Sequence, residues 1–288
     1  MRTIPSTALM TRLAASALAV AAACGGAPAP GDLEMIAGEA MLTSTNGLST
    51  NGLSTNGMST NGMSSNGLSS NGLSTSGLST SGFSTWFLSQ PASYSDMVMR
   101  YVVRCALPAG QSLSYTTGGV TFTWAGVLGL APTWASGSAI PESEQQLISA
   151  CLAAHANKYG VQMDISVRGY KANGSFISVS DNENATYSVE EGCFFGNLFD
   201  GTGVFSAYGA NSALIHPNKT SQRACAISGG VLGDCLPMAS TGTTCQQICT
   251  GNSSYISSYF EFTSCAWNGK NYKPISTRLS LAEITTSP

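Results

Sequence analysis

The chain has 288 residues, with 12 basic and 15 acidic side chains and a formal net charge of −3. Its Lys and Arg residues form no cluster or stripe, which excludes the basic surface typical of nucleic-acid-binding proteins. Beyond the N-terminal region, no stretch approaches the roughly 20 consecutive apolar residues that a membrane-spanning helix requires. We therefore expect a folded domain with no nucleic-acid partner.

The first segment of the chain is typical of a secretion signal. Arg2 and Arg12 precede an apolar stretch, LAASALAVAAA, that ends at Cys24. A helix of this length rises about 16 Å, roughly half of a bilayer core, so the stretch is too short to span a membrane. The sequence predicts that residues 1–23 are a signal peptide and that the protein is exported.

The end of this segment, LAVAAACGG, resembles the lipobox of bacterial lipoproteins, although Ala21 stands where that motif usually has Leu. The resemblance implies that Cys24 carries a lipid and that this lipid anchors the protein to a membrane. Gly25 is not the Asp that signals inner-membrane retention in lipoproteins, which implies an outer-membrane or cell-surface location. The alternative is ordinary cleavage near Ala23, which would give a periplasmic or secreted protein without lipid.

Residues 24–42 are rich in Pro, Gly and Ala and are expected to form a flexible leader. Residues 43–85 carry no charge and repeat a five-residue unit of the type NGLST in eight copies. One position of every unit is apolar: Leu48, Leu53, Met58, Met63, Leu68, Leu73, Leu78 and Phe83. This spacing is similar to that of pentapeptide-repeat proteins, which implies a short β-solenoid, although Asn occupies the position where that family has small inward-facing side chains.

The free energy of the repeat taken alone favours a tether over a solenoid. Eight apolar side chains bury little surface compared with the conformational entropy lost when this glycine-rich segment becomes ordered. We expect residues 43–85 to be a flexible tether, with the short solenoid as the alternative.

Residues 86–288 contain every remaining cysteine and are expected to form one α+β domain. The pattern predicts a helix between Ser95 and Pro108, a hairpin over residues 112–124 and a second helix from Pro141 to Gly160. Alternation predicts a strand over residues 161–169 and further β segments over 175–180 and 186–199. The chain beyond residue 201 is expected to be rich in loops and held by disulfides.

Cysteine number supports export. If Cys24 carries a lipid, eight cysteines remain, an even number that indicates four disulfides in an oxidising compartment. Cys105 and Cys151 lie on apolar helix faces and are candidates to pair with each other. The other disulfide cysteines, whose pairing the sequence leaves open, are Cys193, Cys225, Cys235, Cys245, Cys249 and Cys265.

The domain shows no catalytic motif, and we expect no cofactor and no metal site. His155 on an apolar helix face is expected to be a core residue, and His216 a surface residue. The DNENAT segment, residues 181–186, is expected to be a solvated turn rather than a calcium loop. Glu190 and Glu191 are neighbours on a strand and should face opposite sides.

Aromatic residues suggest how the domain could recognise a partner. The Phe residues of CFFGNLF, residues 193–199, are expected to pack in the core. Tyr255 and Tyr259, four residues apart among serines, are the better candidates for contact with an extracellular glycan or protein.

Four blocks of the domain, RCALPAG, LGLAPTW, ACLAAHANKYGV and EGCFFGNLFD, are similar to a family of uncharacterised bacterial exported proteins and lipoproteins. The resemblance covers most of residues 95–200 and implies that residues 86–288 are one unit. It implies no activity. We expect a surface-tethered lipoprotein that binds or has a structural role in the envelope, and the alternative is a secreted hydrolase with a site assembled from scattered residues.

Overall fold

The computed structural model describes residues 43–46, 48–49, 68–89, 92–157, 163–209, 238–251 and 261–282. All of them belong to the unit Met41–Pro288, and the unit Met1–Ala40 lies outside the described ranges. The predicted signal peptide, Cys24 and the whole leader, residues 24–42, therefore lie outside the described ranges. No helix within the described ranges is long and apolar enough to cross a membrane.

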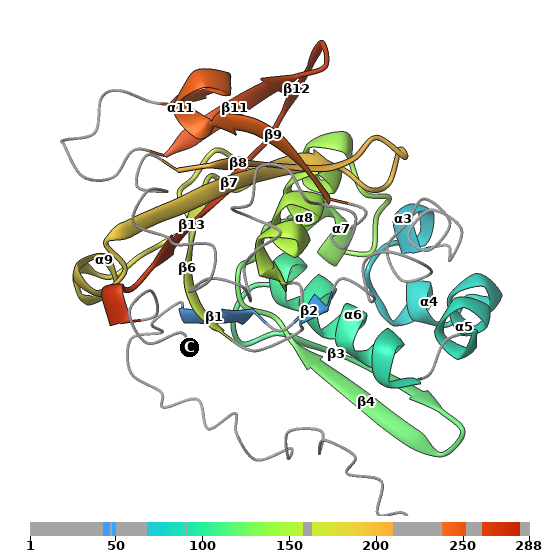
Figure 1. The fold of residues 1–288 in the computed structure, drawn as a ribbon. Helices are drawn as coiled ribbons and strands as arrows, with labels where there is room; N and C mark the ends of the chain where they lie inside the picture. The colour runs from blue at the N-terminus through green and yellow to red at the C-terminus, as the bar shows by residue number, and fades with distance from the viewer. Residues whose placement is uncertain are drawn as a thin grey trace, which may run out of the picture. The chain divides into compact units, whose positions relative to one another are not determined.

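A six-stranded sheet forms the centre of the described structure (Figure 1). Its order is β1 (Thr43–Asn46), β6 (Met163–Gly169), β13 (Ile275–Leu279), β7 (Val189–Asn197), β8 (Gly203–Tyr208) and β9 (Met238–Thr244). Only β8 and β9 pair in parallel; the other neighbours are antiparallel. Because β13 lies between β6 and β7, a late segment of the chain fills the middle of the sheet.

Two long helices cover one face of this sheet. Helix α8 (Glu142–His155) packs on the sheet, and α6 (Ala92–Ala106) packs on α8. A disulfide between Cys105 and Cys151 joins the two helices, which is the pairing that their apolar faces suggested. Both predicted helices are confirmed, although α8 ends at His155 and the chain continues there into β5 (Ala156–Asn157), which pairs with β2 (Leu48–Ser49).

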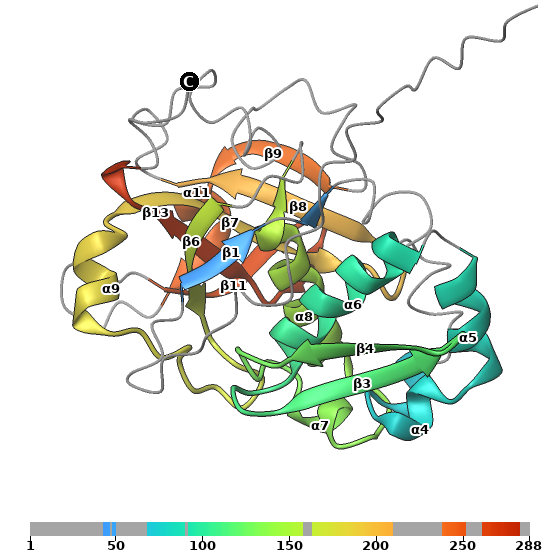
Figure 2. The same ribbon diagram turned by 90° about the horizontal axis from the view of Figure 1, so that it is seen from below.

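The predicted hairpin is confirmed as β3 (Ser112–Thr117) and β4 (Val120–Ala125). Its inner face packs four side chains, Leu113, Tyr115, Phe122 and Trp124, against the helical side of the domain. The indole nitrogen of Trp124 donates a hydrogen bond of 2.8 Å to Oδ1 of Asp96 in α6. Figure 2 shows the hairpin beside α4 and α5.

A smaller sheet covers the other face of β7. It consists of β10 (Cys249–Gly251), β11 (Phe262–Trp267) and β12 (Lys270–Tyr272), and the short helix α11 (Cys245–Ile248) precedes it. Along β7, Phe194 belongs to the core beneath the helices, whereas Cys193 and Phe195 belong to the second core beneath the small sheet. The α+β class with disulfides is therefore confirmed, with a core on each side of β7.

The last four repeat units are part of the first core. Helices α3 (Leu68–Asn71), α4 (Thr75–Leu78) and α5 (Ser81–Leu88) follow one another along the repeat. The apolar residues of these four units, Leu68, Leu73, Leu78 and Phe83, are 0–3% exposed and belong to the main core cluster. Ser74 and Thr80 cap the starts of α4 and α5, because their side chains accept hydrogen bonds from Gly77 N and Phe83 N.

Two glycines of the repeat allow the short helices to pack closely. Gly72 has a φ of 80°, and a Cβ there would overlap the backbone of Gly137. A Cβ on Gly77 would overlap the carbonyl oxygen of Gly72. The glycine of the NGLST unit is thus a packing requirement at these two positions.

The expectation of a flexible tether is therefore wrong for residues 68–85, and the solenoid alternative does not describe them either. The reason is that these units share the core of the following domain instead of burying their apolar residues among themselves. Backbone hydrogen bonds fix the contact, with Leu73 N donating to Trp134 O at 2.9 Å and Ile140 N donating to Ser69 O at 3.0 Å. The described domain thus begins upstream of the expected boundary at Trp86.

Two further segments differ from expectation. Residues 181–186 form a helix, α9 (Asp181–Thr186), which the side chain of Ser180 caps by accepting from Glu183 N. Residues 175–180 form no strand and contribute a single bridge between Phe176 and Tyr170. The remaining helix, α7 (Pro132–Ala135), was not predicted; its first backbone amides donate to the buried carboxylate of Glu144.

We predict that Leu78→Ala lowers the free energy of unfolding by about 2–5 kcal/mol, because it leaves a cavity in the shared core. Ser76→Ala, an exposed change in the same unit, should stay within about 0.5 kcal/mol of the parent. Denaturant unfolding of both variants measures the difference. Equal stability of the two variants would show that the repeat is not part of the core.

Candidate functional sites

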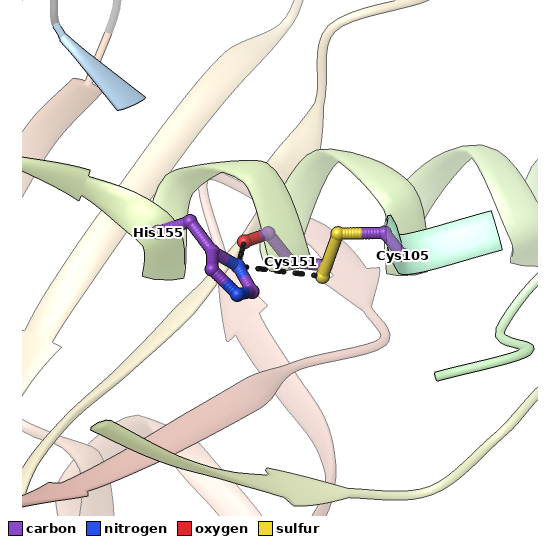
Figure 3. Close-up of side chains that lie close together, drawn as sticks. All are labelled: Cys105, Cys151 and His155. Carbon is purple, nitrogen blue, oxygen red and sulfur yellow. Dashed lines mark hydrogen bonds between the residues drawn. A yellow bond between two sulfur atoms is a disulfide. The ribbon is translucent and has the colours of Figure 1, made fainter. Parts of the chain in front are cut away.

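The first candidate site lies between the two long helices, where Cys105, Cys151 and His155 come together (Figure 3). Helix α6 supplies Cys105, and α8 supplies Cys151 and, one turn later, His155. Nδ1 of His155 lies 2.7 Å from the carbonyl oxygen of Cys151 and 3.6 Å from its Sγ. All three residues are fully buried.

This arrangement identifies His155 as a structural residue. A carbonyl oxygen can only accept a hydrogen bond, so Nδ1 carries the proton and donates it to one of the last carbonyls of α8. The ring of Tyr101 lies 5.4 Å from the imidazole, centroid to centroid. The expectation of a core histidine is confirmed, and the disulfide-bonded sulfurs beside it offer no thiolate to a metal.

The second candidate site is a group of four cysteines beneath the small sheet. Cys193 pairs with Cys245, and Cys249 pairs with Cys265. Cys245 and Cys249, four residues apart, thus belong to separate disulfides. Sγ of Cys193 lies only 3.6 Å from Sγ of Cys249, so the two disulfides are in contact.

The third candidate site is a polar cluster on the face of β6 that points away from α8. Ser166 donates a hydrogen bond to Oε1 of the fully buried Glu183 in α9. Arg168 Nε donates to Ser166 Oγ at 2.7 Å, and its Nη1 donates to Oδ1 of Asn184. Helix α9 therefore supplies partners for an arginine on the sheet, which explains why the DNENAT segment is not a solvated turn.

Glu261, next to the start of β11, is a buried carboxyl group near this cluster and is 8% exposed. Burial raises its pKa to about 7. The positive charges of Arg168 and Arg278 oppose the rise, as does a hydrogen bond with Ser276, and the negative charge of Glu190 adds to it. A carboxyl group with a pKa near neutrality can exchange protons under ordinary conditions.

The structure separates Glu190 from Glu191, as expected for neighbours on a strand. Glu191 is fully buried and accepts a hydrogen bond of 2.6 Å from Thr277 Oγ1. Glu190 is partly exposed and accepts from Nε2 of Gln246 at 3.0 Å. The two carboxylates do not form an acid–base pair.

The remaining predicted residues are either buried Phe residues of the segment 193–199 or residues outside the described ranges. Phe194, Phe195 and Phe199 are buried in the cores, as expected. The residues outside the described ranges are Cys24, His216, Cys225, Cys235, Tyr255 and Tyr259. Sequence reasoning missed Glu261 and Arg168; the alternation of Ser166 and Arg168 with Ile165 and Val167 was the signal that a polar face lay on this strand.

Comparison with known proteins concerns the repeat. Residues 44–69 match the GLTT repeat family in six copies, which confirms that this segment is a repeat. No curated protein and no solved structure gives a significant match to the chain. Within the described ranges the match covers residues 44–46 of β1, all of β2, and Leu68 and Ser69 at the start of α3.

The raised pKa of Glu261 predicts a pH-dependent stability. Its carboxyl group holds a proton in the folded state that it loses in the unfolded state between about pH 4.5 and 7. Stability should therefore fall by about 3 kcal/mol as the pH rises across this window, since the charged form is costly to bury. Glu261→Gln should remove that part of the slope in denaturant unfolding at several pH values, and an unchanged slope would contradict the assignment.

Proposed function

We propose that the protein is an exported lipoprotein, held at the outer membrane or cell surface through Cys24, and that its domain acts by binding or as an envelope component. The observation that carries this proposal is the set of three disulfides, Cys105–Cys151, Cys193–Cys245 and Cys249–Cys265. Structural disulfides form and persist in oxidising compartments, so buried disulfides that join separate elements favour export.

Two features of the sequence add to this proposal. The apolar segment before Cys24 has the layout of a signal peptide, and its end resembles a lipobox. The blocks that resemble a family of bacterial exported proteins and lipoproteins lie within the disulfide-bonded domain. Together these features favour a lipid on Cys24 over simple cleavage.

A partly exposed pair of aromatic rings supports a role in binding. Phe176 is 40% exposed, and its ring lies 4.4 Å from that of Tyr170, centroid to centroid. The two rings flank a turn at Lys171–Gly174, where Lys171 N donates to Ser175 O. Partly exposed aromatic rings combine apolar area with polar edges, and we propose this pair as a contact for an extracellular glycan or protein.

Glu261 favours a second candidate function, that of a secreted hydrolase. Its raised pKa is in the range of a general acid, and two arginines lie close enough to act on its charge. Glu261 is the acid–base group to test, because Nδ1 of the buried His155 is already bound to the Cys151 carbonyl. A screen with ester, glycoside and peptide substrates tests this function. Activity that is lost in Glu261→Gln and retained in Glu142→Gln, a change at an exposed residue, supports a hydrolase. A parent protein without activity in the screen contradicts it.

We predict that Cys24→Ala abolishes membrane association, because the lipid has no other attachment point in the proposal. In Triton X-114 partitioning the parent should enter the detergent phase and the variant the aqueous phase. Gly25→Asp is the matched control: it keeps the lipid and should move the protein to the inner-membrane fraction. Detergent-phase partitioning of Cys24→Ala would contradict the lipid anchor.

A further inference from the structure

The four sulfurs beneath the small sheet come from separate elements and lie in one place. Cys193 belongs to β7, Cys245 begins α11, Cys249 begins β10, and Cys265 lies directly opposite Cys249 on β11. The Sγ atoms of Cys193, Cys249 and Cys265 all lie within 4.8 Å of one another. A third sulfur is therefore within reach of each disulfide.

The surroundings hold these sulfurs in place and limit access to them. Phe195, Phe262 and Tyr272 pack around them in the second core. Cys193, Cys245 and Cys265 are fully buried, whereas Cys249 is 8% exposed. Cys249 is the least buried of the four, so we take Cys249–Cys265 as the first disulfide to be reduced.

We propose that Cys193, Cys245, Cys249 and Cys265 form a thiol–disulfide exchange site that accepts two electrons from an external dithiol and then moves its remaining disulfide to Cys193–Cys249. The substrate class is a dithiol, either a small molecule or a pair of cysteines on another protein. This activity does not depend on the lipid anchor or on the partner of the aromatic pair.

The first step reduces Cys249–Cys265. A thiolate of the dithiol attacks one sulfur of this bond, which forms a mixed disulfide and releases the other cysteine. The second thiol of the dithiol then attacks the dithiol sulfur in the mixed disulfide and releases the cysteine that was bound to it. The dithiol leaves as a disulfide, and Cys249 and Cys265 have gained its two electrons and two protons.

The second step transfers the disulfide within the protein. The Cys249 thiol loses its proton, and the thiolate attacks Sγ of Cys193, 3.6 Å away. The Cys193–Cys249 bond forms, the Cys193–Cys245 bond breaks, and Cys245 leaves and takes up a proton. No electrons are gained or lost in this step, and the protein now has thiols at Cys245 and Cys265.

The released Cys245 thiol already has a hydrogen-bond acceptor. Its Sγ lies 3.3 Å from the carbonyl oxygen of Ala207 on β8. A carbonyl oxygen stabilises the protonated thiol and disfavours the thiolate, so Cys245 is held in the form that attacks poorly in reverse. This contact favours the shifted disulfide over the original one.

The Cys105–Cys151 disulfide serves as an internal control for the proposed exchange. Both of its cysteines are fully buried, and the titratable side chain grouped with its sulfurs is His155 rather than another cysteine. Among the described cysteines no other lies in the same group, so we expect its reduction to release Cys105 and Cys151 without a change of pairing. The proposal predicts a change of pairing in the four-cysteine group and none at this bond.

Limited reduction of the mature protein tests the exchange. The protein is treated with a limiting amount of dithiothreitol, quenched with acid, alkylated, and digested without further reduction for mass spectrometry. In molecules whose four-cysteine group has taken up two electrons, we expect a Cys193–Cys249 disulfide with alkylated Cys245 and Cys265. An intact Cys193–Cys245 disulfide with alkylated Cys249 and Cys265 would overturn the proposal, as would reduction of Cys105–Cys151 before this group.

A pair of variants tests the same transfer without a reductant. Cys265→Ser leaves Cys249 with a free thiol beside Cys193, and we expect the purified variant to contain Cys193–Cys249 and an alkylatable Cys245. The matched variant Cys105→Ser leaves Cys151 free and should keep both disulfides of the group. A Cys265→Ser protein that contains only Cys193–Cys245 would contradict the transfer.

Discussion

The burial of one apolar side chain at every fifth position from Leu68 to Phe83 is the constraint on which the helical side of the domain depends. Helices of four residues are not stable alone, because too few hydrogen bonds offset the ordering of the first turn. Here each turn places its apolar residue in a core that α6, α8 and the hairpin also form. Phe83 and Phe87 contact the hairpin through Tyr115, with ring centroids 4.9 and 5.0 Å apart. Without these repeat units the ring of Tyr115 would lose its contact with Phe83.

The central sheet divides the described domain into two sides with different chemistry. Towards α8, β6 presents Ile165 and Val167 to an apolar core that the Cys105–Cys151 disulfide closes. On the other side lie the Arg168 cluster and the four-cysteine group. Both sides pack an apolar core, and the second side also holds the buried carboxyl group of Glu261 and the two adjacent disulfides. The proposals on binding, acid–base chemistry and thiol exchange all concern side chains outside the first core.

Local patterns in the sequence predicted α6, α8, the hairpin, β6 and β7, because each has a clear period and recognisable ends. They also suggested the Cys105–Cys151 pair, since both cysteines lie on apolar helix faces. The role of the repeat does not follow from local patterns, because the partners of its apolar residues lie far along the chain. Leu68, for example, accepts a hydrogen bond through its carbonyl oxygen from the indole nitrogen of Trp134. The four-cysteine group and Glu261 depend on strand pairing that sequence spacing does not reveal.

Amide hydrogen exchange of the intact protein tests most directly whether the last repeat units belong to the domain. The amide of Leu73 donates to Trp134 O, and that of Leu78 donates to Ser74 O. If these units are part of the core, both amides should exchange as slowly as those in the middle of α8, through the same global unfolding. Exchange of Leu73 and Leu78 at the rate of an unstructured peptide, while α8 stays protected, would contradict the account.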